Sequence, residues 1–203
     1  MDKLVIASNN PGKLKELRAM LAPLGFEAIP QGELGVGEAE EPHDTFLENA
    51  LAKARFASRA TGLPALADDS GLVVPALGGE PGVHSAYYAG HEGDRTQRDA
   101  RNNAKLVAAL AQVTDRRAFY YCVLVLVHSA TDLTPLVAEG RWHGEIEATP
   151  RGVHGFGYDP HFRTEVRSLT AAELDPVEKN RLSHRGKALA ALAQMLGSPP
   201  SQG

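Results

Sequence analysis

The sequence of 203 residues is long enough for one large domain or two lobes, with a substantial hydrophobic core. Hydrophobic residues make up 43% of the chain and charged residues 23%, as is typical of a globular protein. The formal net charge of −4 argues against a general nucleic-acid-binding protein, because such proteins carry a basic excess. The single cysteine, Cys122, is expected to lie buried in a strand.

The amino-terminal segment has too short an apolar run for a signal peptide. No segment approaches the length that a membrane-spanning helix needs. We therefore expect a cytoplasmic protein with neither a membrane nor a nucleic acid as its partner.

The first third of the chain predicts a strand followed by two helices. Residues 3–8 are expected to form the strand, and leucines at helical spacing predict a helix over 14–25. A second helix is expected over 45–62, because Thr45 and Glu48 have the spacing of a capping box and a glycine follows the helix.

A loop is expected between these two helices, and the remainder predicts a strand within 65–74, two helices and two long strands. The segment 31–44 is rich in glycine and acidic residues and is expected to be an exposed loop. A helix is expected near 95–111, and apolar runs predict antiparallel strands over 117–130 and 133–148. The last helix is expected over 182–196.

These elements predict an α/β protein with a central mixed sheet flanked by helices. We expect an elongated, single domain over 1–197, with two lobes around a central cleft. The tail over 198–203 is expected to be disordered.

The motif "SNNPGK" (8–13) joins the first predicted strand to the first helix. A helix N-terminus favours anions, and Lys13 adds a positive charge there, but the motif lacks the glycine spacing of a Walker A loop. It is either a phosphate-binding loop or a turn with a solvated lysine. Lys53, on an otherwise apolar helix face with Asn49, points either into the cleft or toward solvent at the core margin.

Two adjacent carboxylates, Asp68 and Asp69, follow an apolar run in "ALADDSGLVV". Like charges repel, and burial favours neutralising one of them. A magnesium ion shared with Glu40 and Glu41 would remove this penalty, because Mg²⁺ prefers oxygen ligands. Otherwise the glutamates are solvated loop charges and one aspartate caps a turn. Histidine and cysteine do not cluster at zinc-ligand spacing.

The segments "GFGYDP" (155–160) and "SHRGK" (183–187) combine groups that suit a purine. Phe156 can stack on a base, while His184 and Arg185 can donate hydrogen bonds to a carbonyl oxygen. Taken alone, the first segment fits a packed aromatic loop, and the second an ordinary charged first turn, slightly better than a purine site.

Together these motifs resemble the inosine triphosphate pyrophosphatase family over residues 3–196. The resemblance rests on "SNNPGK", "TFLENALAKAR", "ALADDSGL", "GGEPGVHSAYYAG", "GFGYDPHF" and "LSHRGKAL", which occur in the order found in that family. That family hydrolyses non-standard purine nucleoside triphosphates such as ITP, dITP and XTP to the monophosphate and pyrophosphate. The resemblance implies a two-lobed α/β fold, dependence on Mg²⁺, a purine nucleoside triphosphate as substrate, and a homodimer.

The resemblance also implies roles for individual residues. The triphosphate would be held by Ser8, Asn9, Asn10, Pro11, Gly12 and Lys13, with Lys53 assisting. Glu40 and Asp69 match the metal-binding acids. Asp69 also matches the proton acceptor, with Asp68 as the alternative base. The remaining substrate-binding positions are Ser70, Phe156, Gly157, Tyr158, Asp159, Lys179, His184 and Arg185.

Two positions depart from the family pattern. Ser8 and Asn9 stand where Thr-Gly is commoner, and Tyr87 stands where many bacterial relatives have an arginine that contacts phosphate. Two alternatives compete with the purine enzyme: a Maf-type pyrophosphatase acting on modified pyrimidines or TTP, and a non-catalytic nucleotide-binding regulator. The segments 155–160 and 183–187 favour the purine family, and the complete set of acids favours an enzyme.

Overall fold

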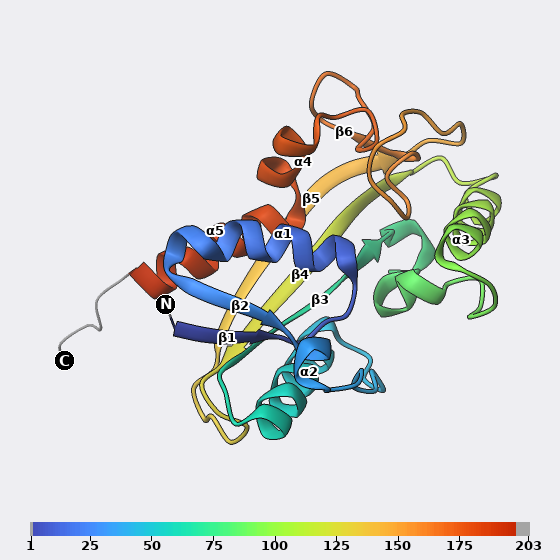
Figure 1. Ribbon diagram of the computed structural model, residues 1–203. Helices are drawn as coiled ribbons and strands as arrows, with labels where there is room; N and C mark the ends of the chain where they lie inside the picture. Colours follow the sequence, from blue (N-terminus) through green and yellow to red (C-terminus); the bar gives the residue numbers. More distant parts are fainter. Residues whose placement is uncertain (1, 198–203) are drawn as a thin grey trace. The chain divides into compact units, whose positions relative to one another are not determined.

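The computed structural model describes residues 2–197, so the tail predicted to be disordered over 198–203 lies outside the described residues. The strands are β1 (Asp2–Ile6), β2 (Phe26–Pro30), β3 (Ala65–Val73), β4 (Arg117–Val127), β5 (Leu136–Ile146) and β6 (Phe162–Thr164). They form one sheet in the order β2-β1-β3-β4-β5-β6 (Figure 1). Since β1 is parallel to β2 and β3 while β5 is antiparallel to β6, the sheet is mixed.

The α-helices flank this sheet, which confirms the predicted α/β class. They are α1 (Pro11–Leu21), α2 (Phe46–Thr61), α3 (Arg95–Ala109), α4 (Pro176–Leu182) and α5 (His184–Gly197). Within residues 2–197, no helix is both long enough and apolar enough to cross a membrane.

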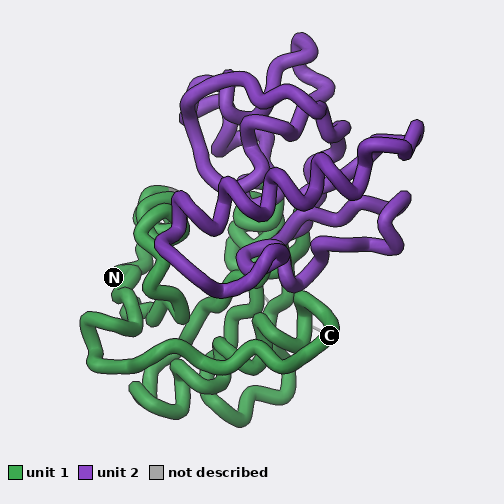
Figure 2. The backbone as a smooth tube through the Cα atoms, turned by 90° about the vertical axis from the view of Figure 1, so that its right-hand side faces the viewer, with its two compact units in different colours: residues 1–69, 122–140, 187–203 green, residues 70–121, 141–186 purple. Residues whose placement is uncertain are grey.

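The chain divides into two compact units, which Figure 2 colours separately. Unit 1 consists of Met1–Asp69, Cys122–Gly140 and Lys187–Gly203, and unit 2 consists of Ser70–Tyr121 and Arg141–Gly186. The boundaries fall inside β3, β4, β5 and α5, so each of these elements begins in one unit and continues in the other.

Unit 1 has helices on both faces of its strands: α1 and α5 lie on one face and α2 on the other (Figure 1). Leu17 of α1, Leu189 of α5 and Ile6 of β1 belong to one buried cluster. The opposite face is covered by α2, whose Ala50 and Ala54 are completely buried. Full burial of each large aliphatic side chain contributes about 1.5–3 kcal/mol.

Unit 2 has an aromatic core. The ring of Phe162 lies 4.7 Å from that of Tyr120 and 5.3 Å from that of Trp142, measured between centroids. Leu106 of α3 packs into the same cluster. This core supports α3 and the loops that follow β5.

The first helix begins at Pro11, three residues earlier than predicted, because Asn10 caps it. The Asn10 Oδ1 atom accepts hydrogen bonds from the backbone N–H groups of Gly12 and Lys13, at 3.0 and 3.3 Å. Proline at the first helical position needs no hydrogen-bond acceptor, so it suits this start.

Three short elements were not predicted, namely β2, β6 and α4. The last helix, predicted near residues 182–196, begins at His184, and Leu182 ends α4. Ser183 separates the two helices, and its Oγ accepts a hydrogen bond from Gly186 N at 3.1 Å, as an N-cap does.

Candidate active site

The adjacent acids Asp68 and Asp69 lie in β3, where successive side chains point to opposite faces. Asp68 pairs with Lys13 of α1, and Asp69 pairs with Lys53 of α2, with 3.1 Å between Nζ and Oδ1. The two lysines therefore come from helices on opposite faces of the sheet. Each carboxylate has its own ammonium partner, which offsets the repulsion that a metal ion was expected to remove.

Asp68 is held at both carboxylate oxygens. Its side chain is completely buried, Oδ1 pairs with Lys13 Nζ, and Oδ2 accepts a hydrogen bond from Cys122 Sγ at 3.2 Å. Cys122 is itself buried in β4, as the sequence predicted. Lys13 and Cys122 therefore fix the position of the Asp68 carboxylate.

Asp69 has a different environment. Burial raises the pKa of this carboxyl above its ordinary value, although the charges of Lys53 and Lys13 oppose the rise. Its Oδ2 atom is buried and has no hydrogen-bond partner among the described residues. A buried acceptor without a donor is a position for a proton, a water molecule or a cation.

Lys53 is buried in α2 and contacts a second carboxylate, that of Glu41. Burial is the largest single influence on the pKa of Lys53 and lowers it, but Asp69, Glu41 and Asp68 together raise it above the ordinary value. The lysine is therefore charged at neutral pH. The glutamate that contacts Lys53 is Glu41, and both Glu41 and Glu40 are exposed.

The segment before Lys13 is tied together by its own side chains. Ser8 Oγ accepts a hydrogen bond from Asn10 N at 3.2 Å, and Asn10 caps α1. Asn9 lies against Gly32, where a Cβ atom would come within 2.8 Å of Asn9 Oδ1. These contacts order the loop and set Lys13 at the N-terminus of α1, where anions are favoured.

The donor set of unit 1 fits a magnesium ion. The acidic groups around Asp69 are carboxylates, which supply hard oxygen ligands, and Asp69 Oδ2 is unpartnered within the described structure. No three histidine, cysteine or acidic side chains converge on one point in residues 2–197. Mg²⁺ commonly takes one or two carboxylates and completes its shell with waters and substrate phosphates. The carboxylates around Asp69 are therefore enough to supply the protein ligands of such an ion.

In unit 2, Asp159 organises the loop that follows Gly155. Its Oδ2 accepts hydrogen bonds from Phe156 N at 2.8 Å and Lys179 Nζ at 2.6 Å, and its Oδ1 accepts one from the Tyr120 hydroxyl at 3.3 Å. Burial raises the pKa of Tyr120, so this hydroxyl stays a donor. Gly155 is required here, because a Cβ atom would lie 2.1 Å from Asp159 Oδ2.

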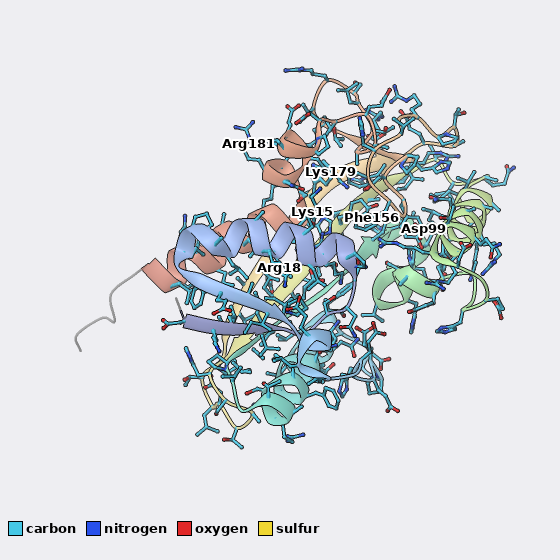
Figure 3. The ribbon with its side chains drawn as sticks, in the orientation of Figure 1. Lys15, Arg18, Asp99, Phe156, Lys179 and Arg181 are labelled. Atoms are coloured by element: carbon cyan, nitrogen blue, oxygen red, sulfur yellow. The ribbon has the colours of Figure 1, made fainter. Side chains whose placement is uncertain are left out.

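The ring of Phe156 is half-buried and has cationic groups beside it (Figure 3). The guanidinium carbon of Arg95 lies 4.4 Å from the ring centroid, and Lys179 Nζ lies 5.1 Å from it. Both are within the range of cation–π attraction. The loop therefore combines an aromatic surface with hydrogen-bond donors.

His184 and Arg185 occupy the first turn of α5, and both are buried. The His184 ring stacks on Tyr120, with 4.8 Å between centroids and 11° between planes. The Arg185 guanidinium donates a hydrogen bond to Ser70 Oγ at 3.2 Å. The structure thus brings together Ser70 and Arg185, two of the predicted substrate-binding residues.

Tyr158 has its side chain in the core of unit 2, where its hydroxyl donates a hydrogen bond to the backbone oxygen of Ser85 at 2.8 Å. Gly157 has a positive φ of 62°, and a Cβ atom there would meet nothing within 4 Å. Tyr158 therefore anchors the loop, and Phe156 is the aromatic residue that the loop presents.

Tyr87, at the position where an arginine was expected, is 40% exposed. Its ring stacks on His91 at 4.2 Å between centroids, and the Arg98 guanidinium carbon lies 5.4 Å from the same ring. A cation therefore lies beside this position although residue 87 carries none.

Three residues that shape the unit 2 cluster had no predicted role. Tyr120 contacts Asp159, and Asp99 and Asn103 contact Gly157. Glu41 was predicted only as part of a shared metal site. Asp99 and Asn103 stand four residues apart on the helix predicted near 95–111, which places them on one face, so their spacing was a usable signal. Tyr120 gave no such signal, because it lies in an apolar strand.

The mixed six-stranded sheet with its two polar clusters defines an α/β protein of two units. A model of the Ham1 family matches residues 4–195, and the chain belongs to this family. This confirms the family resemblance seen in the motifs.

Relatives match along nearly the whole chain. The dITP/XTP pyrophosphatase of Burkholderia pseudomallei (strain K96243) is 64% identical over 195 residues, which cover 96% of this chain and 93% of that protein. The solved structure of a HAM1 protein from Coxiella burnetii has a TM-score of 0.90 and 47% identity, covering 97% of this chain and 98% of that one. The dITP/XTP pyrophosphatase structure from Mycobacterium abscessus has a TM-score of 0.74 and 45% identity, covering 94% and 98% respectively.

Proposed function

We propose that this chain is a nucleoside triphosphate pyrophosphohydrolase that converts non-standard purine nucleotides such as dITP, ITP and XTP to the monophosphate and pyrophosphate. The observation that carries the proposal is the buried lysine–carboxylate cluster of unit 1, with its one unpartnered Asp69 oxygen. The chain is 64% identical to a dITP/XTP pyrophosphatase, which supports the same substrate class.

In this reaction a water oxygen attacks the α-phosphorus, and the bond to the α–β bridging oxygen breaks. The bonding electrons leave with the pyrophosphate, and a proton of the attacking water passes to a base. We assign the base to Asp69, because its buried Oδ2 has no hydrogen-bond partner among the described residues and burial raises its pKa. Asp68, engaged at both oxygens, instead holds Lys13 in position.

The lysines bind the phosphates and stabilise the charge of the departing pyrophosphate. Two lysines face three carboxylates in the cluster, so its net charge is negative before any ligand binds. A magnesium ion, held by Glu40 or Glu41 and by the Asp69 oxygen that does not take the proton, would reverse that sign and neutralise phosphate charge.

The purine is assigned to unit 2. Phe156 supplies a stacking surface, Asp159 shapes the loop, and Lys179 lies beside both. His184 and Arg185 supply donors for the 6-oxygen that hypoxanthine and xanthine share. Adenine has an amino donor at that position, so the donors of His184 and Arg185 would face another donor when ATP binds. The unpaired donors would weaken ATP binding and so favour hypoxanthine and xanthine nucleotides.

The proposal is tested by incubating the protein with dITP, XTP and ATP, with and without Mg²⁺, and separating the products. Release of pyrophosphate and monophosphate from dITP and XTP, at a rate far above that for ATP, is the expected result. Preference for TTP or modified pyrimidines would favour the Maf-type alternative. Tight nucleotide binding without turnover would favour a non-catalytic regulator.

A homodimer and a cytoplasmic location stay predictions. The first follows from the family resemblance, and light scattering coupled to size-exclusion chromatography tests it. The second is tested by fractionation of the native host.

A further inference from the structure

The helix α3 holds the Phe156 loop by two hydrogen bonds to a single glycine. The backbone N–H of Gly157 donates to Asp99 Oδ2 at 2.9 Å, and its backbone oxygen accepts from Asn103 Nδ2 at 2.8 Å. Asp99 and Asn103 are four residues apart, so both lie on the face of α3 that meets the loop. We name this pair with Gly157 the α3 clamp.

The clamp acts on two consecutive peptide planes. The N–H of Gly157 belongs to the peptide that joins it to Phe156, and the carbonyl belongs to the peptide that joins it to Tyr158. Glycine at a φ of 62° has no side chain to limit its rotation, so these bonds restrain a flexible point of the chain. The direction of the Phe156 ring therefore depends on the clamp as well as on the hydrogen bond from Phe156 N to Asp159 Oδ2.

The hydrogen bonds of Asn103 fix the orientation of its side-chain amide. Its Nδ2 also donates to the backbone oxygen of Asp99 at 2.9 Å, so turning the amide over would set Oδ1 against two carbonyl oxygens. Oδ1 is buried and has no hydrogen-bond partner among the described residues. The side chain thus leaves one acceptor unsatisfied, at a cost, while both donor contacts are made.

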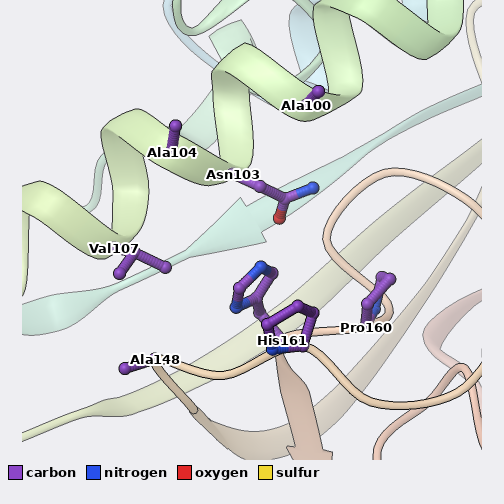
Figure 4. A pocket seen from close by; sticks show the side chains of 8 residues that line it. Ala100, Asn103, Ala104, Val107, Ala148, Pro160 and His161 are labelled. Carbon is purple, nitrogen blue, oxygen red and sulfur yellow. The ribbon is translucent and has the colours of Figure 1, made fainter.

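Packing beside α3 is incomplete next to this loop, although the side chain of Tyr158 is buried in the core of unit 2. A cavity of about 400 Å³ lies against α3, and Asn103 and Val107 of the helix face it together with Pro160 and His161, which directly follow the loop (Figure 4). Close-packed neighbours would otherwise restrain the chain here. The polar contacts to Gly157 therefore add to those that Asp159 and Tyr158 make.

We infer that Asp99 and Asn103 are positioning residues for purine recognition, acting through Gly157 on Phe156. The inference rests on the proposed function, because it takes Phe156 as the surface on which the base stacks. Loss of either contact is expected to weaken base binding and to leave the phosphate cluster of unit 1 unchanged.

The test compares Asp99→Ala and Asn103→Ala with Val107→Ala, a control that alters the same cavity without touching Gly157. Each clamp variant should raise the KM for dITP by about 3–10-fold, the effect of one net hydrogen bond, with kcat within about twofold. The Kd for dIMP should rise by the same factor, whereas the Kd for pyrophosphate should not change. Asp99→Asn keeps an acceptor oxygen and should recover most of the loss.

Thermal unfolding checks that every variant folds. Clamp variants that behave like Val107→Ala, or that lose pyrophosphate affinity as much as dIMP affinity, would overturn the inference. If the wild type released no pyrophosphate from dITP but bound dIMP, the proposed function would fail, and the dIMP measurements would still decide on the clamp. A wild type that released pyrophosphate from dITP while the clamp variants left its KM unchanged would overturn the inference alone.

Discussion

Replacing Lys53 by methionine tests the assignment of Asp69 as the base. Lys53 Nζ lies 3.1 Å from Asp69 Oδ1, and its charge opposes the burial that raises the pKa of Asp69. At an effective dielectric constant of about 20, unit charges at this separation attract by about 5 kcal/mol, before the cost of removing both from water is subtracted. A nearby opposite charge lowers a carboxyl pKa by about 1–3 units in proteins.

The sign of the effect follows from the role of the base. Asp69 must be ionised to accept a proton, so activity falls as the pH drops through its pKa. Without Lys53 the ionised form loses its main stabilising partner, and the pKa of Asp69 rises further. The acid limb of the kcat/KM profile is therefore expected to move to higher pH by about 1–3 units.

The assay is pyrophosphate release from dITP across the acid range at constant Mg²⁺, with kcat/KM reporting the free enzyme. Lys53→Arg keeps the charge and should leave the limb near its wild-type position. Lys15→Met removes an exposed lysine of α1 (Figure 3) and controls for a general change of surface charge. An acid limb that stays in place in Lys53→Met, or moves to lower pH, would refute the assignment of Asp69.

Three further substitutions test the other roles. Asp69→Asn should lower kcat with dITP at least about a hundredfold; its melting temperature at pH 7 should not fall, because a raised carboxyl pKa means that ionisation of Asp69 weakens the folded state. Lys13→Ala should weaken dITP binding more than dIMP binding in calorimetry, since we expect this lysine over the β- and γ-phosphates; equal losses would remove it from the phosphate site. Replacing His184 and Arg185 together by alanine should lower kcat/KM for dITP and XTP and narrow their advantage over ATP, and an unchanged preference would place base reading elsewhere.

Features that depend on near neighbours in the chain were predictable from the sequence. Thr45 caps α2 as expected, with its Oγ1 accepting a hydrogen bond from Glu48 N at 3.2 Å. Gly62 ends the same helix with a φ of 71°, a conformation that glycine adopts without strain. Each of these contacts joins residues within one helical turn, so the local spacing carries the information.

Features that depend on distant pairing were not predictable. The five residues of β2 show no clear alternation, and they form a strand because β1 pairs with them in parallel, from Asp2 opposite Phe26 onward. The choice of Glu41 over Glu40 as the partner of Lys53 depends in the same way on how the acidic loop meets α2. The sequence supplies the acids, but the fold decides which of them meet the lysines.

The pair Asp68 and Asp69 shows how the fold gives two neighbouring identical residues different chemistry. In a strand, consecutive side chains reach opposite faces, so each aspartate meets a lysine from a different helix. Cys122 completes the contacts of Asp68, whereas one oxygen of Asp69 is left open and its pKa is raised by burial. When two neighbouring acids lie in such different environments, they commonly take different roles in catalysis. Asp68 and Asp69 can therefore lie side by side in a buried strand, because each is paired with a lysine. Only Asp69 has an oxygen without a hydrogen-bond partner among the described residues, and Asp69 is the residue that we assign as the base.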